Sequence, residues 1–170
     1  VGVADHVVFK VDRRLENVPG VADLRKGLLA EAMRMLDELR QQAGAGDHPS
    51  LLRTRGAGHI QRGDLAVTHD NLTLAQNEYR AALQLFGALA ERQPDSAQAQ
   101  RDLSISLNKL GDVAVKMGQL AEAKSWFERS LKISEKLALA DSNDAQAQRD
   151  LSTNLNQLGD VAVKMGQLGE

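Results

Sequence analysis

A long internal repeat is the feature of this sequence that most limits how it can fold. The segment at 97–120, AQAQRDLSISLNKLGDVAVKMGQL, returns 48 positions later as AQAQRDLSTNLNQLGDVAVKMGQL, without a gap and with three differences. A repeat of this length is one supersecondary unit that cannot bury its own apolar face, so successive units must stack on one another. We therefore expect an elongated array of units whose function resides on a surface rather than in a pocket.

The 48-residue register extends towards the N-terminus. The pair Gly63-Asp64 precedes Gly111-Asp112 by 48 positions, and Gly159-Asp160 follows it by the same interval. Because the chain begins with Val1 and ends inside a unit, we expect it to be a piece of a longer polypeptide. The register divides the chain into a divergent helical hairpin at 1–48, units at 49–96 and 97–144, and the first helix of a truncated unit at 145–170.

The spacing of apolar residues predicts helices throughout. In the clearest unit these residues recur every three or four positions, which is the spacing of one face of an α-helix. We expect one helix over 94–117, with Asp95 or Ser96 as its N-cap and Gly118 at its end, and a second over 120–140. Similar patterns predict helices at 50–68, 72–92 and 144–165, and a divergent pair at about 3–15 and 24–39. The expected fold is all-α, with about seven helices in about three and a half antiparallel hairpins.

Composition supports this fold class and excludes several functions. Aromatic residues make up only 3% of the chain and apolar residues 42%, so Leu, Ala, Val and Met must build the core, which favours helices over a β-sandwich. A net charge of −2, with both signs mixed along the chain, predicts no binding to nucleic acid or to an acidic membrane. There is no apolar run that could span a membrane or act as a signal peptide. The absence of cysteine fits a cytoplasmic protein.

The sequence contains no motif of an enzyme, a metal site or a cofactor site. The four histidines lie in different predicted helices or loops, without the spacing of metal ligands. Neither Gly44-x-Gly46 nor Gly56-x-Gly58 follows a strand or ends in Gly-Lys-Ser/Thr, as a phosphate-binding loop requires. We expect His59 to be a packing residue, Phe127 to lie in a hairpin core, and Trp126 to pack between units.

Two spacings in the unit at 97–144 resemble the tetratricopeptide repeat. The segment LNKLGDVA from Leu107 and the segment AKSWF from Ala123 follow the family pattern W-x2-L-G-x2-Y and A-x3-F, although they lack its tryptophan and tyrosine. The preceding unit offers HIQRGDLA from His59 and AQNEY from Ala75. The resemblance covers residues 49–170. The chain is similar in particular to long-repeat arrays, rich in RDLSxSLNKLGD, that lie beside kinase, NTPase or protease-like domains in large bacterial signalling proteins.

This resemblance implies a right-handed superhelical solenoid and a non-enzymatic scaffold for protein–protein interaction. In that family the first helix of each hairpin lines a concave groove, in which a protein or peptide partner binds. An Asn side chain in such a groove offers both a donor and an acceptor to the backbone of an extended peptide. The family alignment places towards the groove Ala57, Ile60, Asp64 and Val67, then Ile105, Asn108, Asp112, Val115 and Lys116, and then Thr153, Asn156, Asp160, Val163 and Lys164.

The three differences between the two long segments suggest a surface that is free to vary. They are Ile105/Thr153, Ser106/Asn154 and Lys109/Gln157, and their spacing places them on one helical face. A recognition surface would have this property, so Lys109 and Gln157 join the candidate site. Chance drift at exposed positions after a recent duplication explains the differences equally well, and the candidate residues could also be ordinary solvated positions.

Two other functions remain open from the sequence. The last predicted helix lacks a hairpin partner, so its apolar residues could support self-association. Alternatively, the array could be the regulatory arm of a larger signalling enzyme or of a transcription regulator. The apolar stripe of the last helix consists of Leu151, Leu155, Leu158, Ala162 and Met165.

Overall fold

The computed structural model describes residues 48–167 together with 24, 27, 28, 30–32, 34 and 35. Most of the hairpin expected at 1–48 therefore lies outside the described residues, although the described positions between 24 and 35 are helical. No strand occurs in the part of the chain that the structure describes, so the all-α prediction is confirmed there. The helices are α3 (Pro49–Thr68), α4 (Leu72–Arg92), α5 (Ala97–Lys116), α6 (Leu120–Ala140) and α7 (Ala145–Gln167).

The helix ends follow from local hydrogen bonding. Ser96 is extended and its Oγ accepts a bond from the backbone N–H of Ala99, so α5 begins at Ala97 rather than at the expected position 94. After α5, Gly118 has a φ of +74°, a left-handed conformation that glycine adopts without strain. At the start of α7, one carboxylate oxygen of Asp144 accepts from the backbone N–H groups of Gln146 and Ala147, at 2.9 and 3.1 Å.

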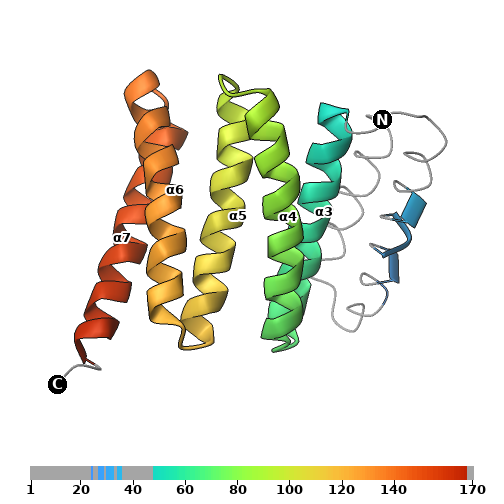
Figure 1. The fold of residues 1–170 in the computed structure, drawn as a ribbon, viewed down its shortest axis with the longest axis horizontal. Coiled ribbons are helices and arrows are strands. Elements are labelled where there is room, and N and C mark those ends of the chain that lie inside the picture. Colours follow the sequence, from blue (N-terminus) through green and yellow to red (C-terminus); the bar gives the residue numbers. More distant parts are fainter. Residues whose placement is uncertain (1–23, 25–26, 29, 33, 36–47, 168–170) are drawn as a thin grey trace.

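The five helices form two layers (Figure 1). Each helix packs against the next along the chain, and the short turns between them make neighbours antiparallel. The first helices of the units, α3, α5 and α7, also reach one another. The guanidinium of Arg53 in α3 lies 2.7 Å from the carboxylate of Asp102 in α5, and Arg101 in α5 lies 3.1 Å from Asp150 in α7. Equivalent members of these two ion pairs are 48 positions apart, and the stacked helices form a helical solenoid.

Aromatic rings that lie against glycines bring the two helices of each hairpin close together. The ring of Tyr79 covers Gly63, and that of Phe127 covers Gly111. A Cβ atom at either glycine would lie 2.3 Å from the ring, so no larger residue fits there without movement. Both rings are almost fully buried, as expected for Phe127. Phe86 covers Gly56 in the same way, a contact that the family pattern did not predict.

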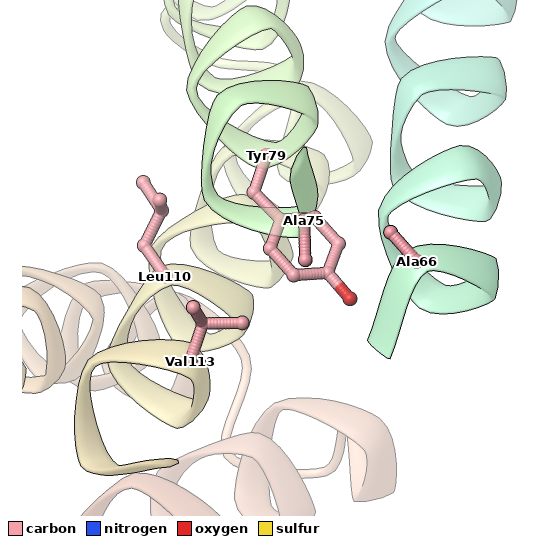
Figure 2. Close-up of a cluster of buried hydrophobic side chains, with 5 residues drawn as sticks. All are labelled: Ala66, Ala75, Tyr79, Leu110 and Val113. Carbon is pink, nitrogen blue, oxygen red and sulfur yellow. The ribbon is translucent and has the colours of Figure 1, made fainter. Parts of the chain in front are cut away.

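The core continues from one unit into the next. Figure 2 shows one cluster, in which Ala66 of α3 and Tyr79 of α4 meet Leu110 and Val113 of α5. Trp126 packs against this cluster and also against the next one, which contains Phe127, so its predicted position between units is confirmed. Because every unit shares its core with a neighbour, the described helices form one continuous array.

Candidate partner-binding surface

The candidate residues all lie on α3, α5 and α7, the layer of first helices. We call the exposed side of this layer the first-helix surface. Its members are Ile60, Asp64 and Val67 on α3, Ile105, Asn108, Lys109, Asp112 and Lys116 on α5, and Thr153, Asn156, Gln157, Asp160 and Lys164 on α7.

Four of these residues bond to one another across the units. The ammonium group of Lys109 lies 2.7 Å from the carboxylate of Asp64. One unit later, the amide of Gln157 donates to the carboxylate of Asp112 over 3.0 Å. Both pairs are 45 positions apart, so they are equivalent ties between consecutive first helices. The difference Lys109/Gln157 therefore replaces an ion pair with a hydrogen bond from an uncharged amide to a carboxylate. The family pattern could not reveal this contact.

The carboxylates of this layer influence neighbouring protonation equilibria. The hydroxyl of Tyr79 donates to Asp64 over 2.6 Å. Burial, followed by this bond and the negative charge of Asp64, raises the pKa of Tyr79 well above its ordinary value, so the phenol stays neutral. The pKa of Asp112 is also raised. The main cause is the protein that displaces water from around its carboxylate, and this outweighs the opposing influence of Lys109 and Gln157.

The apolar candidates divide between core and surface. Ile60 and Val67 are partly buried because they pack against the cluster that contains Tyr79, and Val115 packs against the cluster that contains Phe127. In contrast, Ile105 is 41% exposed and Val163 is 61% exposed. Only the exposed ones can give a partner a large contact area.

The asparagine column differs from one unit to the next. Asn156 is exposed. Asn108 is only partly exposed, and its carbonyl oxygen is buried with no hydrogen-bond partner among the described residues. The two side chains therefore do not present equivalent groups to solvent.

The interpretation of the three sequence differences as one exposed face is wrong. Ser106 and Asn154 are both fully buried. The amide of Asn154 donates to the hydroxyl of Ser134 over 2.9 Å, and its carbonyl oxygen lies 3.3 Å from the hydroxyl of Ser130. Ser130 also lies 2.7 Å from Ser104, so the network joins α5, α6 and α7.

The cause of this difference lies on the preceding second helix. At the positions of Ser130 and Ser134 in α6, the equivalent residues of α4 are Ala82 and Phe86. An asparagine is satisfied beside the serines, whereas the apolar pair offers it no partner. The change from Ser106 to Asn154 is therefore matched by changes on the preceding helix. The sequence signal that could have revealed it is that Ala82/Ser130 and Phe86/Ser134 change between the same two units.

Among the described residues there is no metal site, and the pocket next to α3 and α4 is small. Within the described part of the chain, no group of three His, Asp or Glu side chains is placed to hold a metal ion. His59 lies between α3 and α4, where its Nδ1 is 2.7 Å from the carboxylate of Glu78, which also pairs with Arg62. A pocket beside His69 and Leu74 has a volume of about 180 Å³, below the roughly 300 Å³ at which sites for small-molecule ligands begin. None of the described helices is both long and apolar enough to cross a membrane.

Comparison with known proteins identifies the repeat. Residues 102–163, which span α5, α6 and most of α7, match the sequence model of the tetratricopeptide repeat. Among solved structures, the chain is similar to the de novo designed helical repeat protein DHR64, with 15% identity, a TM-score of 0.46, and coverage of 97% of this chain and 79% of that one. It is also similar to the DHF119 filament, with 13% identity, a TM-score of 0.42, and coverage of 98% and 81%. No curated protein sequence gives a significant match. Residues 102–163 are thus a match to the tetratricopeptide repeat, within a stack of helical hairpins that extends over the described helices.

Proposed function

We propose that this chain is a non-enzymatic scaffold that binds a protein or peptide partner on the first-helix surface. The match of residues 102–163 to the tetratricopeptide repeat supports a role in protein interaction. The choice of surface rests on one observation: some of its residues connect neighbouring units, and others are exposed and available to a partner. Four of them tie neighbouring units together, namely Asp64, Lys109, Asp112 and Gln157. No hydrogen bond or ion pair among the described residues joins the other exposed candidate side chains to a neighbouring unit.

These remaining side chains offer a mixed set of contacts, which we call the open set. It comprises Ile105, Lys116, Thr153, Asn156, Asp160 and Lys164, all of them exposed. The amide of Asn156 can both donate to and accept from the main chain of an extended peptide, whatever its sequence. Lys116 and Lys164 are 48 positions apart, so acidic side chains of a partner can meet the same charge on two units.

The ties explain why such a surface would bind well. A partner loses affinity when the surface must become ordered during binding. Here the pairs Lys109–Asp64 and Gln157–Asp112 fix the spacing of the three first helices before any partner arrives. The open set is therefore held on a preorganised frame.

A displayed library of random peptides, selected on the immobilised chain, would test this proposal. Selected peptides would be titrated against the wild-type chain and against the triple variant Lys116→Ala, Asn156→Ala, Lys164→Ala. We expect the triple variant to bind at least roughly tenfold more weakly, because contacts concentrated in a few residues dominate most interfaces.

The matched control is Lys132→Ala, Lys136→Ala on α6, which removes two exposed charges from the other layer. Binding by this variant should not change, and the helical circular dichroism of both variants should equal that of the wild type. Peptides that bind the triple variant as tightly as the wild type would disprove the choice of surface.

A further inference from the structure

The two most similar helices of the molecule have different surroundings. Leu107 in α5 is 2% exposed because α6 covers it, whereas its equivalent in α7, Leu155, is 52% exposed. Ala114 is fully buried, and its equivalent Ala162 is exposed. The outer face of α7, which comprises Leu155, Gly159 and Ala162, thus repeats a face that α5 buries, and no described residue covers it.

This outer face contains an unfilled notch. A Cβ atom at Gly63 or at Gly111 would lie 2.3 Å from the ring of Tyr79 or Phe127, respectively. At Gly159, the third glycine of the same column, no atom lies within 4 Å of that position. The backbone of α7 therefore offers the contact that receives an aromatic ring in both preceding units.

The two filled notches define what fits the third. Each ring comes from a helix that also places an alanine four positions before it, Ala75 before Tyr79 and Ala123 before Phe127. Both alanines are fully buried. In the second case Ala123 joins Ala114 and Phe127 in one apolar cluster. The complement of α7 is thus an amphipathic helix with the pattern Ala-x3-aromatic.

A second copy of the described chain cannot supply this helix without opening its own core. Tyr79, Phe86 and Phe127 are at most 3% exposed. Trp126 is packed against both apolar clusters. Hence every aromatic ring of the described residues is already engaged, and a helix from outside them is the better occupant.

We propose that the outer face of α7 is a docking site for an amphipathic helix that places an aromatic ring on Gly159 and a small side chain against Ala162. The site is distinct from the first-helix surface, and the partner is recognised by the pattern that α4 and α6 carry. Shape decides the fit: a glycine gives room for the ring, and the apolar side chains of Leu155 and Ala162 lose their contact with water.

A peptide with the sequence of residues 119–140 is the direct probe, because α6 already covers the equivalent face of α5. A lactam between Lys124 and Glu128 would hold it helical, since these two side chains are exposed and form an i,i+4 pair. Binding of the fluorescent peptide to the chain would be followed by anisotropy. We expect saturable binding that weakens at least roughly tenfold when the peptide carries Phe127→Ala.

The matching change in the protein is Gly159→Leu, which places a side chain in the notch; its Cβ atom meets no other atom, so the helix should form normally. It should weaken peptide binding by a similar factor. The control Asn156→Ala, on the first-helix surface, should not affect the peptide. Conversely, Gly159→Leu should not affect ligands of the first-helix surface, so the two proposals can fail separately.

Three outcomes would overturn the proposal. The first is equal affinity of the peptide for the wild type and for Gly159→Leu. The second is no binding of the lactam-bridged peptide to a chain that sediments as a monomer. The third is a dimer that Gly159→Leu dissociates, which would make a second copy of the chain the occupant.

Discussion

At the scale of single residues, glycines of one chain have different structural roles. Gly111 makes room for a ring, Gly118 adopts a left-handed conformation, and Gly87 does neither, since its φ is ordinary and nothing lies within 4 Å of its missing Cβ. Sequence alone distinguished Gly111 and Gly118 through the family pattern and the helix end. It could not identify Gly56, because the ring of Phe86 that covers it comes from a position without a family signature.

The two helical glycines Gly111 and Gly87 should respond oppositely to alanine. The variant Gly111→Ala should lower the free energy of unfolding by about 1–3 kcal/mol, because the new methyl group overlaps the ring of Phe127. The variant Gly87→Ala should raise it by up to about 1 kcal/mol through helix propensity. Urea titration monitored by circular dichroism measures both. Equal effects of the two changes would show that the ring does not need the glycine.

The asparagines Asn154 and Asn156 form a similar pair. Asn154→Ala should lower the free energy of unfolding by about 1–3 kcal/mol, because buried serine hydroxyls lose their partner. Asn156→Ala should change it by less than about 0.5 kcal/mol, since the side chain is exposed. Thermal melts of both variants test this. A stable Asn154→Ala variant would mean that water replaces the amide.

At the scale of helices, the start of α7 couples stability to pH. Its cap, Asp144, has a pKa below the ordinary 3.8, mainly because its carboxylate accepts from the backbone N–H of Ala147, with a further contribution from Arg101. The folded state thus favours the ionised form, and this stabilisation is present above pH 3.8 and is lost as the pH falls through the lowered pKa.

The variant Asp144→Asn should remove this dependence on pH. Asparagine is also a good N-cap, so the helix keeps its start while the titrating group is gone. The Tm of the variant should fall less than that of the wild type between about pH 6 and about pH 2. Parallel curves for the two proteins would contradict the role of the carboxylate. Asp95→Asn is the control, because that exposed side chain makes no hydrogen bond or ion pair among the described residues.

At the scale of the whole molecule, neighbours rather than sequence set the stability of each helix. The segments at 107–117 and 155–165 differ only at Lys109 and Gln157, so their intrinsic exchange rates are nearly equal. Burial of a Leu side chain contributes about 1.5–3 kcal/mol to stability. Leu107 in α5 is buried, whereas its equivalent Leu155 in α7 is exposed.

Amide hydrogen exchange should therefore be roughly tenfold or more faster in 155–165 than in 107–117. Mass spectrometry of peptides that begin at Ile105 and at Thr153 would measure it, because Ile105-Ser106 and Thr153-Asn154 give these two peptides different masses. Equal protection would show that the array unfolds only as a whole. Addition of the helical peptide of residues 119–140 should slow exchange in 155–165 alone if it docks on α7.

The sequence predicted most of the fold and less of the candidate surface. The periodicity of apolar residues predicted the helices to within a few residues. The 48-residue repeat predicted how they follow one another along the chain. The sequence could not predict the ion pair between Asp64 and Lys109, because that contact depends on the distance between neighbouring first helices. Nor could it recognise Ser106 and Asn154 as buried, since polar residues are usually assigned to the surface.

The buried network of Asn154 has a consequence for how such an array can be recombined. Asn154 on α7 matches Ser130 and Ser134 on α6, while Ser106 on α5 follows a helix that carries Ala82 and Phe86 at those positions. Exchange of whole hairpins would separate these matched residues and leave an amide stranded against apolar groups. A cut within the hairpin, at the turn after the first helix, would instead separate Ser104 from Ser130, or Gly56 from the ring of Phe86. A designer who wishes to lengthen or shuffle this array should therefore move α5, α6 and α7 together, because one buried hydrogen-bond network joins all three helices.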